Sequence, residues 1–158
     1  MTAKAVRIAD AIAAELNAAT LSMPIEARVR YVLDETLEDA GAAGVKVDIA
    51  IATGASELSD RDALGYVDAF DLAIRKRLTS SDIDQETGEP IASRMSDLIS
   101  LVEEINETLA ASERLNSYDA AVWQDSEIRA FWVPAHVRQY NQFTGVLRVR
   151  YSVEESLA

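Results

Sequence analysis

Residues 143–153 read FTGVLRVRYSV, and this stretch shows most clearly how the chain folds. Apolar and polar side chains alternate along it, and Arg148 and Arg150 fall together on the polar face. Successive side chains of a β-strand point to opposite faces of its sheet, so the alternation predicts a half-buried, antiparallel strand. The other stretches that fit a strand of this kind are residues 26–33, 45–52, 66–78 and 118–124.

Two longer stretches have the periodicity of a helix. In residues 3–21, Ile8, Ile12 and Leu16 recur at every fourth position and form one apolar stripe, which is typical of an amphipathic helix. A longer stripe in residues 91–115 is formed by Ile91, Met95, Leu98, Val102, Ile105 and Leu109.

Together these elements predict one domain, residues 1–158, with an α+β fold. We expect a two-layer sandwich in which two helices pack on one face of a mainly antiparallel sheet of four to five strands. Residues 79–90, TSSDIDQETGEP, have almost no apolar side chains and predict a projecting loop. The strongest apolar faces of helix and sheet are expected to meet, with Leu98, Val102 and Ile105 packing on Val47, Ile49, Phe70 and Leu72.

The amino-acid composition limits the kinds of partner and environment expected for the chain. With 15 Lys and Arg against 27 Asp and Glu, the formal net charge is -12, so a tight, non-specific grip on nucleic acid is not expected. The chain has no cysteine, which fits a reducing compartment and excludes thiolate metal sites. It has neither an apolar run long enough to span a membrane nor the apolar core of a signal peptide, so we expect no membrane association.

The sequence contains few groups with the spacing of a chemical site. His136 is the only histidine, and one histidine without cysteine cannot build the usual zinc site. Residues 82–89 are acidic like a calcium loop, but counting from Asp82 the sixth and twelfth positions are Thr87 and Ser93 instead of Gly and Glu. We therefore expect no catalytic, metal or cofactor site, and we predict that the chain is not an enzyme.

Arginines are concentrated on the polar faces of the predicted strands, with Arg75, Arg148 and Arg150 as the main examples. Because arginine binds carboxylates bidentately, this face is a candidate surface for an acidic partner, such as a second copy of the chain. The alternative is a solvated strand face whose charges discourage aggregation.

Aromatic side chains gather in residues 130–143, AFWVPAHVRQYNQF, which we expect to be a loop-like connection. Trp132 and Tyr140 belong to the residue types that anchor protein interfaces, although aromatics in such a place can also cover the core. The predicted interface residues are thus Arg75, Trp132, Tyr140, Arg148 and Arg150.

The order of elements and several motifs resemble the tail terminator (tail completion) group of neck proteins from tailed phages. The matching stretches are IADAIAAELNAA at 8–19, FDLAIRKRL at 70–78 after VKVDIAIA at 45–52, and QFTGVLRVRYSV at 142–153. They follow the family's order over most of the chain. Residues 56–65, SELSDRDALG, depart from it, so roles of individual loops are not carried over.

The resemblance implies a structural virion protein without enzymatic activity or cofactor. Members of the family are α+β subunits that form a ring, commonly a hexamer, which caps the tail tube and faces the head-side neck. The implied partners are further copies of the chain, the tail tube protein and a neck connector protein, with DNA only passing through the lumen. The implied location is the tail or neck of the virion, and the host cytoplasm during assembly.

Two other interpretations stay open. One is a different neck component, a head–tail connector or stopper. The other is a non-viral binding module that works as a monomer or dimer.

Overall fold

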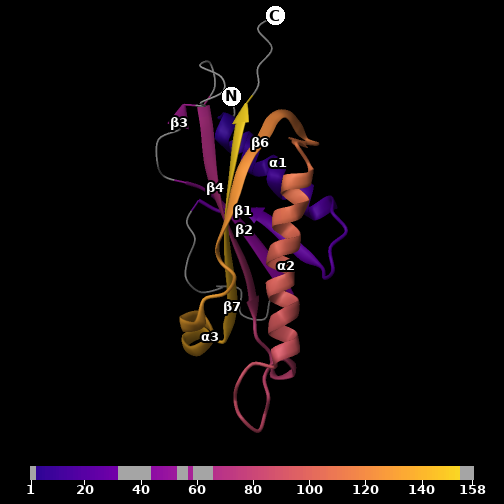
Figure 1. Cartoon of the computed structure of the whole chain (residues 1–158), viewed down its shortest axis with the longest axis vertical. Coiled ribbons are helices and arrows are strands. Elements are labelled where there is room, and N and C mark those ends of the chain that lie inside the picture. The colour runs from indigo at the N-terminus through magenta and orange to yellow at the C-terminus, as the bar shows by residue number, and fades with distance from the viewer. Residues whose placement is uncertain (1–2, 32–43, 53–56, 59–65, 154–158) are drawn as a thin grey trace, which may run out of the picture.

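The computed structural model describes residues 3–31, 44–52, 57–58 and 66–153. Within these ranges the chain forms three α-helices, a short 3-10 helix at Ser80–Asp82 and seven strands (Figure 1). The helices are α1 (Lys4–Ala18), α2 (Ala92–Ala111) and α3 (Pro134–Tyr140). The strands are β1 (Ile25–Val29), β2 (Val45–Ile51), β3 (Glu57–Leu58), β4 (Tyr66–Arg77), β5 (Arg114–Leu115), β6 (Tyr118–Ala130) and β7 (Gln142–Val153).

All seven described strands belong to one mixed sheet. Six follow the order β1-β2-β4-β7-β6-β5, and β3 pairs with the first residues of β4. The predicted α+β class is confirmed, but the sheet has more strands than the four to five expected. In addition, β1 runs parallel to β2, whereas every other pair is antiparallel. Alternation shows which face a side chain takes and not the direction of the strand, so the sequence could not reveal this parallel pair.

The two long helices cover one face of the sheet (Figure 1). α1 lies over β1 and β2, whereas α2 lies mainly over β6 and β7. Leu98, Val102 and Ile105 are buried as predicted, in one core with the apolar faces of β2 and β4. The direct packing of these three side chains on Val47, Ile49, Phe70 and Leu72 stays a prediction, although all seven side chains belong to the same buried core.

A glycine allows α2 to approach the sheet closely. A Cβ atom built on Gly145 of β7 would lie 2.6 Å from Cγ2 of Val102, well inside van der Waals contact. The next nearest atoms are the carbonyl oxygen of Phe131 at 3.3 Å and a ring carbon of Phe143 at 3.6 Å. A residue without a side chain is therefore needed where α2 meets β7.

The aromatic segment contains a helix that we did not predict. α3 begins at Pro134, a residue whose fixed φ suits the first helical turn, and ends at Tyr140. The next residue, Asn141, caps the helix in the left-handed conformation with φ of 49°. The segment before it is also more regular than expected, since β6 extends to Ala130. α3 lies beside the first residues of β7, beyond the point where β6 stops pairing with that strand.

The loop from residue 79 to 90 extends past the start of α2, at the lower end of the molecule in Figure 1. Hydrogen bonds and a β-bridge stabilise the base of this loop. The Asp82 carboxylate accepts hydrogen bonds from the Thr79 backbone N–H (2.9 Å) and from Lys76 Nζ (2.5 Å). Ile83 and Pro90 form a β-bridge across the loop, and the Ile91 N–H donates to the Asp82 carbonyl at 2.8 Å.

Candidate interaction surfaces

The arginines of β7 lie on the outer face of the sheet, opposite the helices, and both form ion pairs within the chain. Arg148 donates to both carboxylate oxygens of Asp71 on β4, from Nε at 2.7 Å and from an Nη at 2.9 Å. Arg150 donates to Asp125 on β6 at 2.8 Å. The pair with Asp71 raises the pKa of the Arg148 guanidinium above its ordinary value, with a smaller contribution from Glu127.

Arg75 is placed differently from the prediction. It is only 4% exposed and donates to the fully buried carboxylate of Asp48, which also accepts a hydrogen bond from Arg28 Nε at 2.5 Å. Burial alone would raise the pKa of Asp48, but the hydrogen bonds from Arg28 and Arg75 outweigh it and hold the pKa below its usual value.

The outer face therefore carries charges that neutralise one another across neighbouring strands. Lys46 of β2 binds Glu26 of β1 and extends the same pattern to the edge of the sheet. For Arg75 the expectation of an open, partner-facing side chain is wrong, because the residue is buried. Arg148 and Arg150 remain partly exposed, and their role in an interface stays a prediction.

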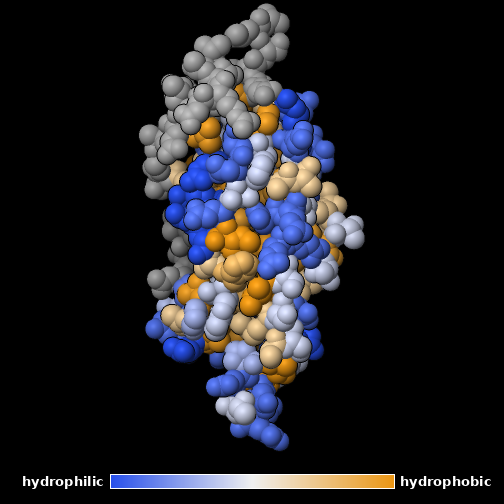
Figure 2. Space-filling view, in the orientation of Figure 1, coloured by the Kyte–Doolittle hydropathy of each residue, from blue (hydrophilic) through white to orange (hydrophobic). Residues whose placement is uncertain are grey.

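A concave surface lies between α3, the first half of α2 and the projecting loop. It is a groove of about 610 Å³. Its lining residues are Ile83, Gly88, Glu89, Pro90, Met95, Ile99, Trp132, Pro134, Val137, Arg138 and Asn141. Figure 2 shows hydrophobic surface between α2 and α3 and a hydrophilic tip on the projecting loop.

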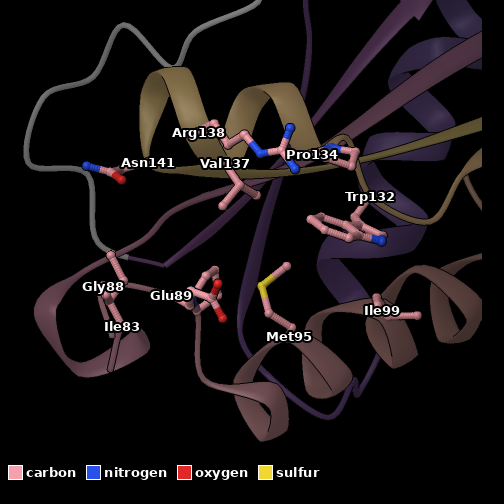
Figure 3. Close-up of a pocket in the computed structure, with 11 residues that line it drawn as sticks. Ile83, Gly88, Glu89, Met95, Ile99, Trp132, Pro134, Val137, Arg138 and Asn141 are labelled. Atoms are coloured by element: carbon pink, nitrogen blue, oxygen red, sulfur yellow. The ribbon is translucent and has the colours of Figure 1, made fainter. Parts of the chain in front are cut away.

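The interior of the groove is apolar and its borders are polar. Met95 projects from α2 toward Val137 and Trp132 on the other wall, and Ile99 lies on α2 on the side of Trp132 (Figure 3). The charged lining residues are Arg138 of α3 and Glu89 of the loop, one of each sign. Such a surface buries apolar side chains of a ligand and orients them through a few polar groups.

The two predicted aromatic anchors have different places. Trp132 lines the groove and is 41% exposed, so the structure brings it to a surface where a partner can contact it. Tyr140 is half-buried and packs edge-on against His136, with ring centroids 5.5 Å apart. His136 in turn contacts Thr144 of β7, with Nδ1 and Oγ1 2.7 Å apart, and this polar contact joins α3 to the sheet.

The groove itself was missed by sequence reasoning. Its walls come from three segments, and one of them, α3, was interpreted as a loop. Pro134 followed seven residues later by Asn141 is a start-and-stop pattern that would have indicated a short helix.

In the described ranges, no group of three or more His, Cys, Asp or Glu side chains is arranged to hold a metal ion. None of the helices in these ranges is long and apolar enough to cross a membrane. The sequence matches no protein-family model, and no curated protein matches it at a significant level.

Proposed function

We propose that this chain is the subunit of a tail terminator ring in a tailed bacteriophage. In this role several copies, six in the usual family arrangement, close the end of the tail tube and offer a surface to the head-side neck. The proposal starts from the resemblance of residues 8–19, 45–52, 70–78 and 142–153 to that group.

The observation that supports it best is the apolar groove next to a projecting loop at one end of the molecule. Concave apolar surfaces that contain a half-exposed tryptophan are typical of the centres of protein interfaces. The loop supplies Ile83, Glu89 and Pro90 to the groove, so a partner bound there would contact both the loop and α2.

The charge of the chain suits a ring through which DNA passes. With a net charge of -12, the subunit repels phosphates at long range and would not retain the duplex. The arginines described above already bind carboxylates of the same sheet, so they add little attraction for DNA.

Electron microscopy of tail tubes tests the proposal. The purified chain is mixed with tubes assembled from the tube protein of the same genome, and we expect a ring at one end of each tube. Trp132→Ala should lower the fraction of capped tubes. Phe131→Ala is the matched control, since Phe131 is 44% exposed but does not line the groove.

Tubes left uncapped by the wild-type chain would contradict the proposal. Binding to a connector complex instead of the tube would favour the connector or stopper alternative. A chain that stays monomeric and binds a peptide or small acidic ligand in the groove would favour the binding module.

A further inference from the structure

The groove between α2, α3 and residues 79–90 leaves apolar side chains of α2 uncovered. Leu98 and Val102 of this helix are buried in the core, whereas Met95 and Ile99, which line the groove, are only partly buried. Trp132 on the opposite wall is exposed as well. Apolar side chains that gather on a concave surface mark a site of interaction more often than they mark ordinary surface.

The borders of the groove carry one unpaired charge of each sign. Arg138 on the α3 wall and Glu89 on the loop wall are both exposed (Figure 3). Neither side chain forms an ion pair or a hydrogen bond with another residue in the part of the chain that the structure describes. In this they differ from Arg148 and Arg150 of the sheet, whose charges are already paired.

We propose that the groove binds a short segment of a partner protein with two apolar side chains about one helical turn apart, an acidic side chain at Arg138 and a basic side chain at Glu89. This inference rests on the proposed function, in which the partner is the tube protein or a neck protein. It names the chemistry of the segment that the partner would place in the groove.

The spacing of the apolar side chains follows from α2. Met95 and Ile99 are four residues apart, so they stand on one face of the helix with about 5–6 Å between them. Two apolar side chains of the partner with a similar spacing would pack against this pair on one side and against Trp132 on the other. A half-exposed tryptophan offers a large apolar contact of the kind that dominates the energy of interfaces.

The charges of the segment follow from the unpaired residues. A carboxylate binds the Arg138 guanidinium through two parallel hydrogen bonds, and an ammonium or guanidinium group pairs with the Glu89 carboxylate. A segment with one charge of each sign has no net charge. The chain's own charge of -12 therefore does not repel it at long range, as it would repel an acidic segment.

The walls of the groove are fixed before a partner binds. His136 of α3 contacts Thr144 of β7, and the Leu78 N–H donates a hydrogen bond of 2.7 Å to the carbonyl of Asn141 at the end of this helix. On the other wall, the β-bridge across residues 79–90 holds the base of the loop. Binding to fixed walls costs less conformational entropy than binding that has to order them.

Fluorescence anisotropy of labelled peptides mixed with the full chain tests the proposal. Each peptide has blocked ends, two leucines four positions apart and either one aspartate or one lysine beside them. Peptides with serine in place of both leucines are the controls. We expect both leucine peptides to bind saturably and the serine peptides not to bind, and Trp132→Ala should weaken the leucine peptides about tenfold.

Two substitutions of opposite sign test the charges. Arg138→Glu should weaken the aspartate peptide about three- to tenfold and leave the lysine peptide bound at least as tightly, and Glu89→Lys should do the opposite. Arg129→Glu and Glu107→Lys are the matched controls, because they make the same changes of charge at exposed residues that do not line the groove.

Three results would overturn the proposal. The first is leucine peptides that bind no better than serine peptides or are unaffected by Trp132→Ala. The second is groove substitutions that act no more strongly than their controls, since the effect would then come from the net charge alone. The third is self-association of the chain that Trp132→Ala abolishes while no peptide binds, because a second copy would then occupy the groove.

These outcomes are separable from those of the tube experiment. Peptide binding that follows the predicted variants without any capping of tubes would support the assignment of the groove and refute the tail terminator role. Tubes that Arg138→Glu and Glu89→Lys cap as well as wild type, while the peptides fail to bind, would do the reverse.

Discussion

The ion pair between Asp48 and Arg75 is buried, and its burial determines how much stability the protein should lose when the pair is broken. Asp48→Leu removes the carboxylate that both Arg28 and Arg75 contact. Arg75 is 4% exposed and Asp48 fully buried, so the guanidinium would lose this carboxylate where little water can replace it. Breaking a buried pair by removing one partner costs about 3–5 kcal/mol. We expect the free energy of unfolding to fall by that amount in urea titrations followed by circular dichroism.

A matched pair on the same face serves as the control. Asp71→Leu removes the bidentate partner of Arg148, but both side chains are about one quarter exposed, at 25% and 23%. Water can solvate the remaining guanidinium, so the cost should be about 1 kcal/mol or less. The double variant Asp48→Leu with Arg75→Met should recover most of the stability, because it leaves no buried charge of this pair. Equal losses for Asp48→Leu and Asp71→Leu, or a double variant as unstable as Asp48→Leu, would refute this reasoning.

The same pair predicts a dependence on pH. The pKa of Asp48 is lowered in the folded chain, so its contribution is complete above the unfolded pKa of about 4 and is lost as the pH falls through the lower, folded pKa. We expect wild type to lose more stability than Asp48→Leu when urea unfolding is compared at pH 7 and pH 3. A contribution from Asp82, whose pKa is also lowered, is common to both proteins.

Two further predictions concern the core and the loop. Gly145→Ala should lower the stability by about 1–3 kcal/mol, because the new methyl group would collide with Val102, and Val102→Ala should relieve part of this loss in thermal melts; purely additive losses would argue against the clash. Asp82→Ala removes the carboxylate that binds Thr79 and Lys76 and should accelerate proteolytic cleavage within residues 79–90, whereas an unchanged cleavage rate would show that this carboxylate does not order the loop.

The faces of the strands and helices were predictable because they are encoded locally. Val47 and Ile49 in β2, like Phe70 and Leu72 in β4, alternate with polar residues and are all fully buried. Strand direction and the partner of each helix depend on the path of the chain between elements, which periodicity does not describe. This is why the parallel pairing of β1 and the position of α2 over β6 and β7 were not foreseen.

The partners of the arginines were hidden for a related reason. Asp48, Asp71 and Asp125 stand on the polar faces of their strands in the sequence, just as Arg75 and Arg148 do on theirs. Only the register places Asp71 opposite Arg148, and two β-bulges in β6 shift the register further along the sheet. Without knowledge of the strand register, the sequence does not distinguish charges that pair within the sheet from charges that are available to a partner.

The internal pairing changes what a partner of this chain would meet. Arg148 and Arg150 are already paired with the carboxylates of Asp71 and Asp125. They therefore offer an acidic partner little net attraction. Two copies that each carry a charge of -12 also repel one another at long range, which disfavours association through charge alone. Specific association would then depend on short-range fit, which the apolar groove around Trp132 can provide. The arginines of the outer face join neighbouring strands of one chain, and the groove between α2, α3 and residues 79–90 is the surface better suited to a partner.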